Sequence, residues 1–166
     1  MSLDSRIAKL DGDTNWLHEF PNPDNTDHGY QSFYDSVDTT IMGNNTYKVI
    51  QGFDVDFPYP DKQNYVFTRS ADKINTDEVN YVSKNPVSFV KKLKSQKGKD
   101  IWLIGGGQIN SLLLNAGLID VLQIFIMPIV LGEGLPLFSS TTDLSKLKLV
   151  STKQYSTGAV ELTYHQ

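Results

Sequence analysis

The sequence feature that most constrains this chain is a run of three glycines, Gly105–Gly107, between two apolar segments. The segment before it, Ile101–Ile104, is uninterrupted and apolar and predicts a buried strand, whereas Ile109–Leu118 has the apolar spacing of a helix. A strand, a glycine turn and a helix bring bare backbone amides and the positive end of a helix dipole together, which favours a bound phosphate. A close strand–helix packing turn is the competing interpretation, because the spacing matches neither the Rossmann fingerprint nor the P-loop.

A second junction of the same kind is predicted upstream. Thr39–Gly43 has the pattern of a buried strand, and Thr46–Ile50 opens a helix for which Asn44 or Asn45 is the expected cap. Both glycine junctions follow strands. Since ligands of open parallel sheets bind at the carboxyl ends of the strands, we expect both junctions at one ligand-binding edge.

The rest of the chain alternates strands and helices and then continues as strands alone. The pattern predicts helices at Gly29–Asp35 and Pro86–Lys97, and strands at Asn64–Thr68, Val79–Ser83, Leu122–Gly132, Leu147–Gln154 and Val160–His165, with Met1–Leu17 a loop around the apolar pair Trp16–Leu17. This order predicts an α/β fold in one domain, residues 1–166. Its central sheet is mostly parallel, helices cover both faces, and an antiparallel hairpin ends the chain.

Composition excludes several classes of function. The net charge of −4 argues against nucleic-acid binding, and the absence of cysteine rules out disulfides and thiolate metal sites. No apolar run reaches membrane-spanning length, and no signal peptide pattern is present. We therefore expect a cytoplasmic protein that binds a small molecule, with no membrane, nucleic-acid or metal partner.

Several segments together resemble the dihydrofolate reductase superfamily. They occur in the family's order at plausible spacings: Ile41–Tyr47, Tyr65–Ser70 and Ile101–Gly107. The closer resemblance is to the branch that contains the reductase domain of bacterial riboflavin biosynthesis, because of Ser2–Asp4 near the start and Pro128–Phe138 near the end. The resemblance covers nearly the whole chain and implies a three-layer sandwich that binds NADPH across the carboxyl edge of its sheet.

The resemblance also implies roles for individual residues. The strand end at Ile104 would support the nicotinamide half of NADPH. The glycine turn, with a cis Gly–Gly bond, would lie under the pyrophosphate. Arg69 would pair with the 2′-phosphate. A surface arginine is the alternative for Arg69. Carried over onto this sequence, the cofactor-binding residues are Gly43, Asn45, Thr46, Thr68, Arg69, Ser70, Ile104, Gly105, Gly106, Gly107 and Gln108.

The chain departs from the family's pattern at three places. Asn44 stands where the family commonly has arginine, which removes a cationic phosphate contact worth about 1.5–3 kcal/mol, or about tenfold or more in affinity. Ser5 stands where the family has glycine. Relatives also carry a strand before Ser2–Asp4 that runs through the middle of the sheet, so we expect a domain that lacks its usual first strand.

The candidate proton donors are Asp4 and Asp27, because reduction of a C=N bond needs a proton on nitrogen and a buried carboxyl with a raised pKa is the usual device. An ordinary loop aspartate is the alternative for each. Tyr30, Phe33 and Tyr34 would stack on a flat ring, or they are plain core.

The preferred hypothesis is an NADPH-dependent reductase of a pterin-like heterocycle. A reductase of a ribosylamino-pyrimidine phosphate is the alternative, and it needs a cationic pocket, for which Arg6, Lys9 and His28 are the candidates. A nucleotide-binding module without turnover is the third interpretation. A homodimer formed through the last strands is the expected assembly.

Overall fold

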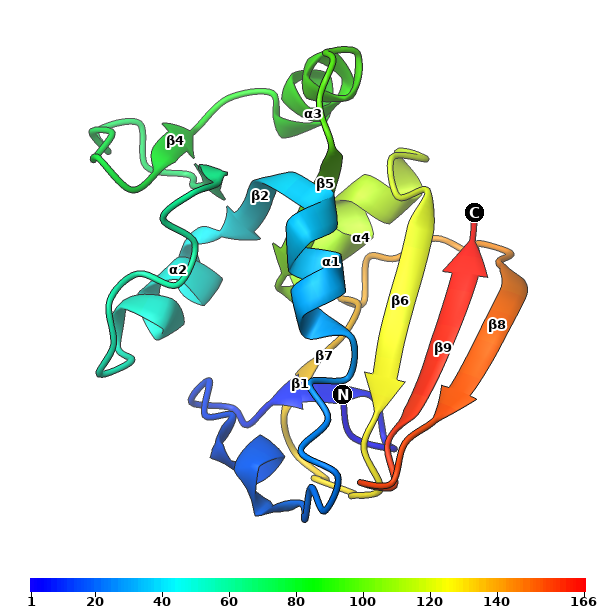
Figure 1. Cartoon of the computed structure of the whole chain (residues 1–166). Helices are drawn as coiled ribbons and strands as arrows, with labels where there is room; N and C mark the ends of the chain where they lie inside the picture. The colour runs from blue at the N-terminus through cyan, green and yellow to red at the C-terminus, as the bar shows by residue number, and fades with distance from the viewer.

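The computed structural model describes all 166 residues of the chain. Helices and strands are interspersed up to residue 126, and only strands follow (Figure 1). The strands are β1 (Arg6–Ala8), β2 (Val37–Gly43), β3 (Gln63–Phe67), β4 (Asn80–Val82), β5 (Asp100–Gly105), β6 (Val121–Ile126), β7 (Leu135–Pro136), β8 (Lys148–Gln154) and β9 (Val160–His165). The helices are η1 (Asn15–Glu19, 3₁₀), α1 (Tyr30–Ser36), α2 (Asn44–Gln51), α3 (Pro86–Lys94) and α4 (Gly107–Asn115).

The first large sheet is parallel and has four strands in the order β4-β3-β2-β5. Its register places Gly43, at the end of β2, beside Phe67, at the end of β3, and Met42 beside Gly105. The carboxyl ends of three strands therefore lie next to one another, and the two glycine junctions lie at this edge, as the sequence predicts.

Helices cover both faces of the parallel sheet. Tyr34 of α1 and Tyr47 of α2 pack on the face that Trp102 and Ile104 share. Val90 and Leu93 of α3 and Leu113 of α4 pack with Ile41 on the opposite face, to which Ile101 and Leu103 point. Alternate residues of β5 thus enter two separate cores, which is the period of a strand buried on both sides. The α/β three-layer prediction is confirmed.

The C-terminal part is a second sheet, antiparallel, in the order β6-β9-β8. The turn between β8 and β9 contains Gly158, and the predicted hairpin is confirmed with its first strand starting at Lys148. A third core of Trp16, Met127, Tyr155 and Ala159 joins η1 to the end of this sheet.

Four local predictions are wrong. The segment Met1–Leu17, predicted as a loop, contains β1 and the beginning of η1. The strand predicted at Leu122–Gly132 ends at Ile126, because Pro128 cannot donate to a ladder. The helix predicted to reach Lys97 ends at Lys94. The asparagine cap is absent: Gly43 occupies the cap position of α2 and no side chain caps the helix. None of the helices has the length and apolar character needed to cross a bilayer.

Candidate active site

The glycine turn connects β5 to α4 at the carboxyl edge of the parallel sheet. Gly105 has φ +115°, in the region that favours glycine, and its bond to Gly106 is cis. Gly106 is the cap residue of α4, and no side chain caps that helix. Gly105 is buried, whereas Gly106 and Gly107 are partly exposed, and the first amides of α4 have no acceptor within the helix. Such amides suit an anionic group.

The second glycine junction lies directly against the first. A Cβ added to Gly106 would lie 3.5 Å from Oγ1 of Thr46, and one added to Gly43 would lie 3.9 Å from the amide nitrogen of Gly106. Thr46 is partly exposed in the first turn of α2, with Asn45 exposed beside it. The uncapped amino ends of two helices therefore meet at one place, and each adds a partial positive charge.

A third segment reaches the same edge from the end of β3. The guanidinium of Arg69 donates a 3.0 Å hydrogen bond from Nη2 to Oε1 of Gln108, which lies in the first turn of α4. Thr68 shapes the turn, because its Oγ1 accepts a 3.1 Å hydrogen bond from the amide of Ser70. Arg69 has no carboxylate partner and is exposed, so its charge is available to an anion at this edge.

The residues available at this edge fit a dinucleotide phosphate. Two uncapped helix starts, one hydroxyl and one unpaired guanidinium converge there, and Gly106 presents no side chain to fill the space. The structure brings together the predicted residues of all three segments: Gly43, Asn45, Thr46, Thr68, Arg69, Ser70, Ile104, Gly105, Gly106, Gly107 and Gln108.

Sequence reasoning missed a two-stranded ribbon that lies across the glycine turn. β1 pairs with β7 antiparallel, with Arg6 opposite Pro136. The side chain of Ile7 comes within 3.7 Å of a Cβ placed on Gly106, and the carbonyl oxygen of Pro136 lies 2.5 Å from a Cβ placed on Gly107. Position 107 therefore requires glycine, because any side chain there would clash with the Pro136 carbonyl. The motif Pro128–Phe138, which contains β7, is recognisable in the sequence, but no local pattern indicates that it pairs with β1.

Asn110 is a second residue that the sequence did not single out. Its Nδ2 donates a 2.9 Å hydrogen bond to the carbonyl of Leu137, while its Oδ1 is buried without a hydrogen-bond partner. That oxygen lies 3.5 Å from a Cβ placed on Gly105. A buried acceptor next to the turn is one that a ligand donor or a water molecule would satisfy.

Neither predicted proton donor has the required environment. Asp4 accepts hydrogen bonds from the Ser2 hydroxyl at 2.6 Å and from the amides of Leu131 and Gly132 at 3.0 and 2.8 Å, and these lower its pKa to about 2. The backbone amides of Gln31 and Gly29 donate to Asp27 and likewise lower its pKa. Both carboxylates are ionised loop anchors, so the hypothesis of a raised pKa is wrong at both positions.

The aromatic residues of α1 form one side of the parallel sheet's core. The rings of Phe33 and Trp102 meet edge to face with centroids 5.1 Å apart, and Tyr30 lies 6.3 Å from Trp102. Phe33 and Tyr34 are half-buried, whereas Tyr30 is 47% exposed. Phe33 and Tyr34 are therefore core residues, and Tyr30 is the aromatic ring of this helix that solvent reaches.

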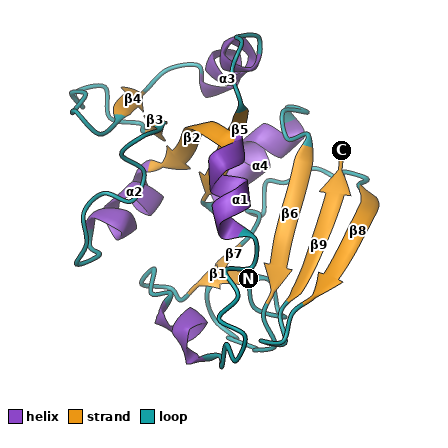
Figure 2. Ribbon diagram, viewed as in Figure 1, coloured by secondary structure: helices purple, strands orange, loops and turns teal.

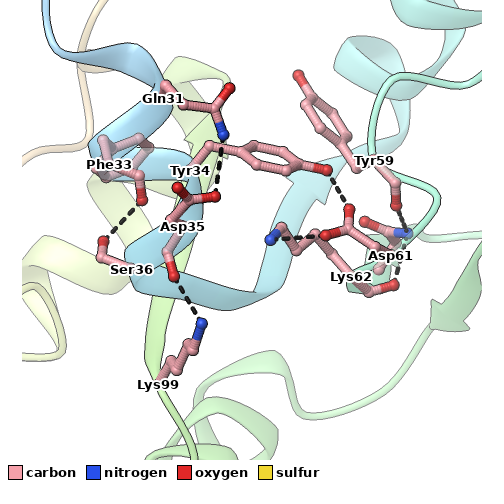
Figure 3. Close-up of polar contacts among 10 residues, drawn as sticks. Gln31, Phe33, Tyr34, Asp35, Ser36, Tyr59, Asp61, Lys62 and Lys99 are labelled. Carbon is pink, nitrogen blue, oxygen red and sulfur yellow. Dashed lines mark hydrogen bonds and ion pairs between the residues drawn. The ribbon is translucent and has the colours of Figure 1, made fainter.

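Polar contacts at the other end of α1 fix its position (Figure 3). The Tyr34 hydroxyl donates to Asp61, and the Lys62 ammonium lies 3.0 Å from the same carboxylate and 3.9 Å from the Tyr34 ring centroid. Burial, followed by this hydrogen bond, raises the pKa of Tyr34. The Lys99 ammonium donates to the Asp35 carbonyl at 2.7 Å, which ties α1 to the start of β5.

The three candidate cations do not form one pocket. Lys9 pairs with Asp13 at 3.0 Å, and His28 shares a 3.0 Å hydrogen bond with Thr157. Arg6 lies in β1 next to the glycine turn and donates from Nε to the carbonyl of Gly132 at 3.1 Å. Of the three, only Arg6 belongs to the β1–β7 ribbon, and its side chain lies against Gly132 and Gly134.

Comparison with known proteins gives the family. A sequence profile of the RibD C-terminal domain matches residues 1–160. The chain is 41% identical over 164 residues to the uncharacterized protein YwjB of Bacillus subtilis (strain 168), covering 99% of this chain and 92% of that protein.

Solved structures share the fold. A putative riboflavin biosynthesis protein from Shewanella sp. PV-4 matches with a TM-score of 0.87 and 32% identity, over 99% of this chain and 94% of that one. Dihydrofolate reductase from Enterococcus faecalis, solved with NADP(H), matches with a TM-score of 0.70 and 17% identity, over 99% and 91% of the two chains. With a family match that spans almost the whole sequence, this chain belongs to the RibD C-terminal domain family, and its fold is that of dihydrofolate reductase.

Proposed function

We propose that this protein is an NADPH-dependent reductase that transfers a hydride to a pterin-like or pyrimidine-like heterocycle. The observation that carries this proposal is the convergence of the two uncapped helix starts, at Gly43 and Gly106, with the unpaired guanidinium of Arg69. Membership in the RibD C-terminal domain family supports a reductase of this fold.

Each part of the edge has a distinct task under this proposal. The amides at the starts of α2 and α4 bind the pyrophosphate, with the Thr46 hydroxyl as an additional donor. Arg69 pairs with the 2′-phosphate and thereby selects NADPH over NADH, since a guanidinium binds a phosphate with two parallel hydrogen bonds. When bound, NADPH supplies the hydride. Ile104, the last apolar residue before the turn, supports the nicotinamide half.

A second candidate substrate class is a ribosylamino-pyrimidine phosphate. Arg6 favours it, because this cation lies in β1, whose next residue Ile7 packs against the glycine turn. The carbonyl of Gly132 occupies only its Nε, so the two terminal nitrogens remain as donors for a sugar phosphate. The similarity to a putative riboflavin biosynthesis protein also supports this class.

Binding and turnover separate these possibilities. NADPH is titrated while the fluorescence of Trp102 and Trp16 is followed, and absorbance at 340 nm is then recorded with dihydrofolate and with the ribosylamino-pyrimidine phosphate. Saturable binding of NADPH with turnover of either substrate supports the reductase. An Arg6→Gln variant that slows only the phosphorylated substrate would assign that class. Binding without turnover of any heterocycle indicates a nucleotide-binding module, and absence of NADPH binding refutes the proposal.

A further inference from the structure

One side of α4 is held against the loop that follows β7. Gly107, Ser111 and Asn115 follow one another at intervals of four and therefore lie on the same side of the helix. In Figure 2, the loop that leaves β7 runs beside α4 before it reaches β8. At the far end of the contact, the Asn115 side chain donates to the carbonyl of Thr141 at 2.9 Å. The near end of the same contact lies at the glycine turn.

Ser111 is fully buried, and its hydroxyl is at the centre of this contact. The hydroxyl donates to the carbonyl of Gly107 at 2.8 Å and accepts from the amide of Ser139 at 2.8 Å. The Thr142 hydroxyl lies 2.6 Å from the same oxygen. A hydroxyl has one proton and two lone pairs, so these three neighbours use its full hydrogen-bonding capacity.

The Gly107 carbonyl receives hydrogen bonds from both sides of the contact. The Ser111 hydroxyl donates to it from the helix, and the Ser139 amide donates to it at 3.3 Å from the loop. The Pro136 carbonyl also lies against Gly107, at the place where a side chain would begin. The first residue of α4 is thus fixed by groups that belong to two different segments.

The direction of this carbonyl determines the direction of the next amide. The Gly107 carbonyl and the Gln108 N–H belong to one planar peptide unit, which is trans, so the two groups point in opposite directions. Because the carbonyl points along α4 towards Ser111, the N–H points back out of the helix start, where it has no acceptor within the helix. Donors that bond to the carbonyl also polarise the peptide, which strengthens its N–H as a donor.

The proposed pyrophosphate site depends on such amides because no cation is assigned to it. Asn44, an uncharged residue, stands at the start of α2, and Arg69 is assigned to the 2′-phosphate. The pyrophosphate is left with the amides of two helix starts and the Thr46 hydroxyl. The direction and strength of each amide therefore contribute more to the affinity than they would beside a cation.

We propose that Ser111 is a positioning residue for the nucleotide, an inference that rests on the proposed function. By bonding to the Gly107 carbonyl, the Ser111 hydroxyl directs the Gln108 amide towards the pyrophosphate and strengthens it as a donor. Ser111 does not touch the nucleotide itself, because its side chain is fully buried between α4 and the loop.

Two alanine variants separate this role from simple anchoring of the loop. Ser111→Ala removes the hydroxyl that bonds to Gly107, whereas Asn115→Ala removes the bonds of the same helix side to Thr141 and Asp143 and leaves Gly107 untouched. Ser111→Ala is expected to raise the Kd for NADPH about fivefold, while the Kd for adenosine 2′-monophosphate, which has no pyrophosphate, stays unchanged. Asn115→Ala should lower the urea midpoint and leave both dissociation constants unchanged. Equal NADPH dissociation constants for the two variants would overturn the proposal.

Amide NMR gives a readout that depends on neither turnover nor NADPH. Inorganic pyrophosphate is titrated into nitrogen-15-labelled protein, and the Gln108 amide proton is expected to move to lower field as it donates to the anion. The movement should be as large in Asn115→Ala as in the unaltered chain and clearly smaller in Ser111→Ala. Thr142→Val, which keeps Ser111 but removes its hydroxyl neighbour, should give an intermediate movement and decides the question if Ser111→Ala does not fold. Equal movement in all of these proteins would refute the role of Ser111.

The failure of this inference differs from the failure of the proposed function. If the unaltered chain binds pyrophosphate at Gln108 but does not bind NADPH, the proposed function is wrong and the amide shifts alone decide the role of Ser111. If NADPH binds and Ser111→Ala does not weaken it, only the positioning role is refuted. A chain that binds neither compound refutes both.

Discussion

Replacement of Arg69 by glutamine is expected to weaken NADPH binding about tenfold while leaving NADH binding unchanged. A charge-assisted hydrogen bond contributes about 1.5–3 kcal/mol. Arg69 is exposed, with one 3.0 Å hydrogen bond to Gln108, so we take the lower end of that range. About 1.5 kcal/mol corresponds to roughly a tenfold change in Kd.

The assay is a fluorescence titration of both nucleotides at low and high salt. Wild-type affinity for NADPH should fall as salt increases, and Arg69→Gln should show a smaller dependence, because surface charge interactions are screened. Lys148→Gln is the matched control: it removes one positive charge from exposed β8, in the other sheet. An unchanged ratio of the NADPH and NADH dissociation constants in Arg69→Gln would refute the assignment of the 2′-phosphate to this residue.

Three further predictions concern stability, each measured by urea unfolding. Gly107→Ala should lower the free energy of unfolding by about 1–3 kcal/mol, because the new Cβ lies 2.5 Å from the Pro136 carbonyl oxygen; an unchanged midpoint would contradict this close approach. Asp4→Asn should destabilise the protein at pH 7 and flatten its pH dependence. The lowered pKa of Asp4 contributes stability above its ordinary pKa near 4 that is lost as the pH falls towards 2, so parallel pH profiles would refute this role. Asn64→Ala should lower the free energy of unfolding by about 3 kcal/mol, because this buried side chain accepts a hydrogen bond from the Thr40 hydroxyl and donates to three backbone carbonyls. Asn80→Ala, at an exposed position, is the control and should lower it much less. Equal losses of stability in the two variants would contradict this role of Asn64.

The local signals in the sequence are sufficient to predict the layers of the fold and the sheet edge where the two glycine junctions meet. Ile101–Ile104 and the glycines after them predict the strand, turn and helix that the structure contains, because periodicity and glycine act over a few residues. The family and the fold class that the motifs indicated are confirmed. NADPH as the cofactor, the homodimer and the cytoplasmic location stay predictions.

Features that depend on distant partners could not be predicted in this way. β1 has only three residues, and its partner β7 follows 127 residues after its last one, so no local pattern marked it. The pKa of Asp4 is lowered by amides at positions 131 and 132, which the sequence around Asp4 does not contain. The end of β6 before Pro128 follows from a local rule, but whether a proline bends or ends a strand depends on its neighbours in space.

The ribbon of β1 and β7 also determines when the glycine turn is completed during synthesis. The Pro136 carbonyl can approach Gly107 only after Pro136 has left the ribosome. β1 is synthesised much earlier and has no strand to pair with until β7 emerges. A nascent chain that stops between α4 and β7 already has Gly43 and Gly105–Gly107 but lacks the covering strand β7. Under the proposed function, we expect such an intermediate to hold nucleotide weakly, so nucleotide binding would begin only in the last fifth of translation.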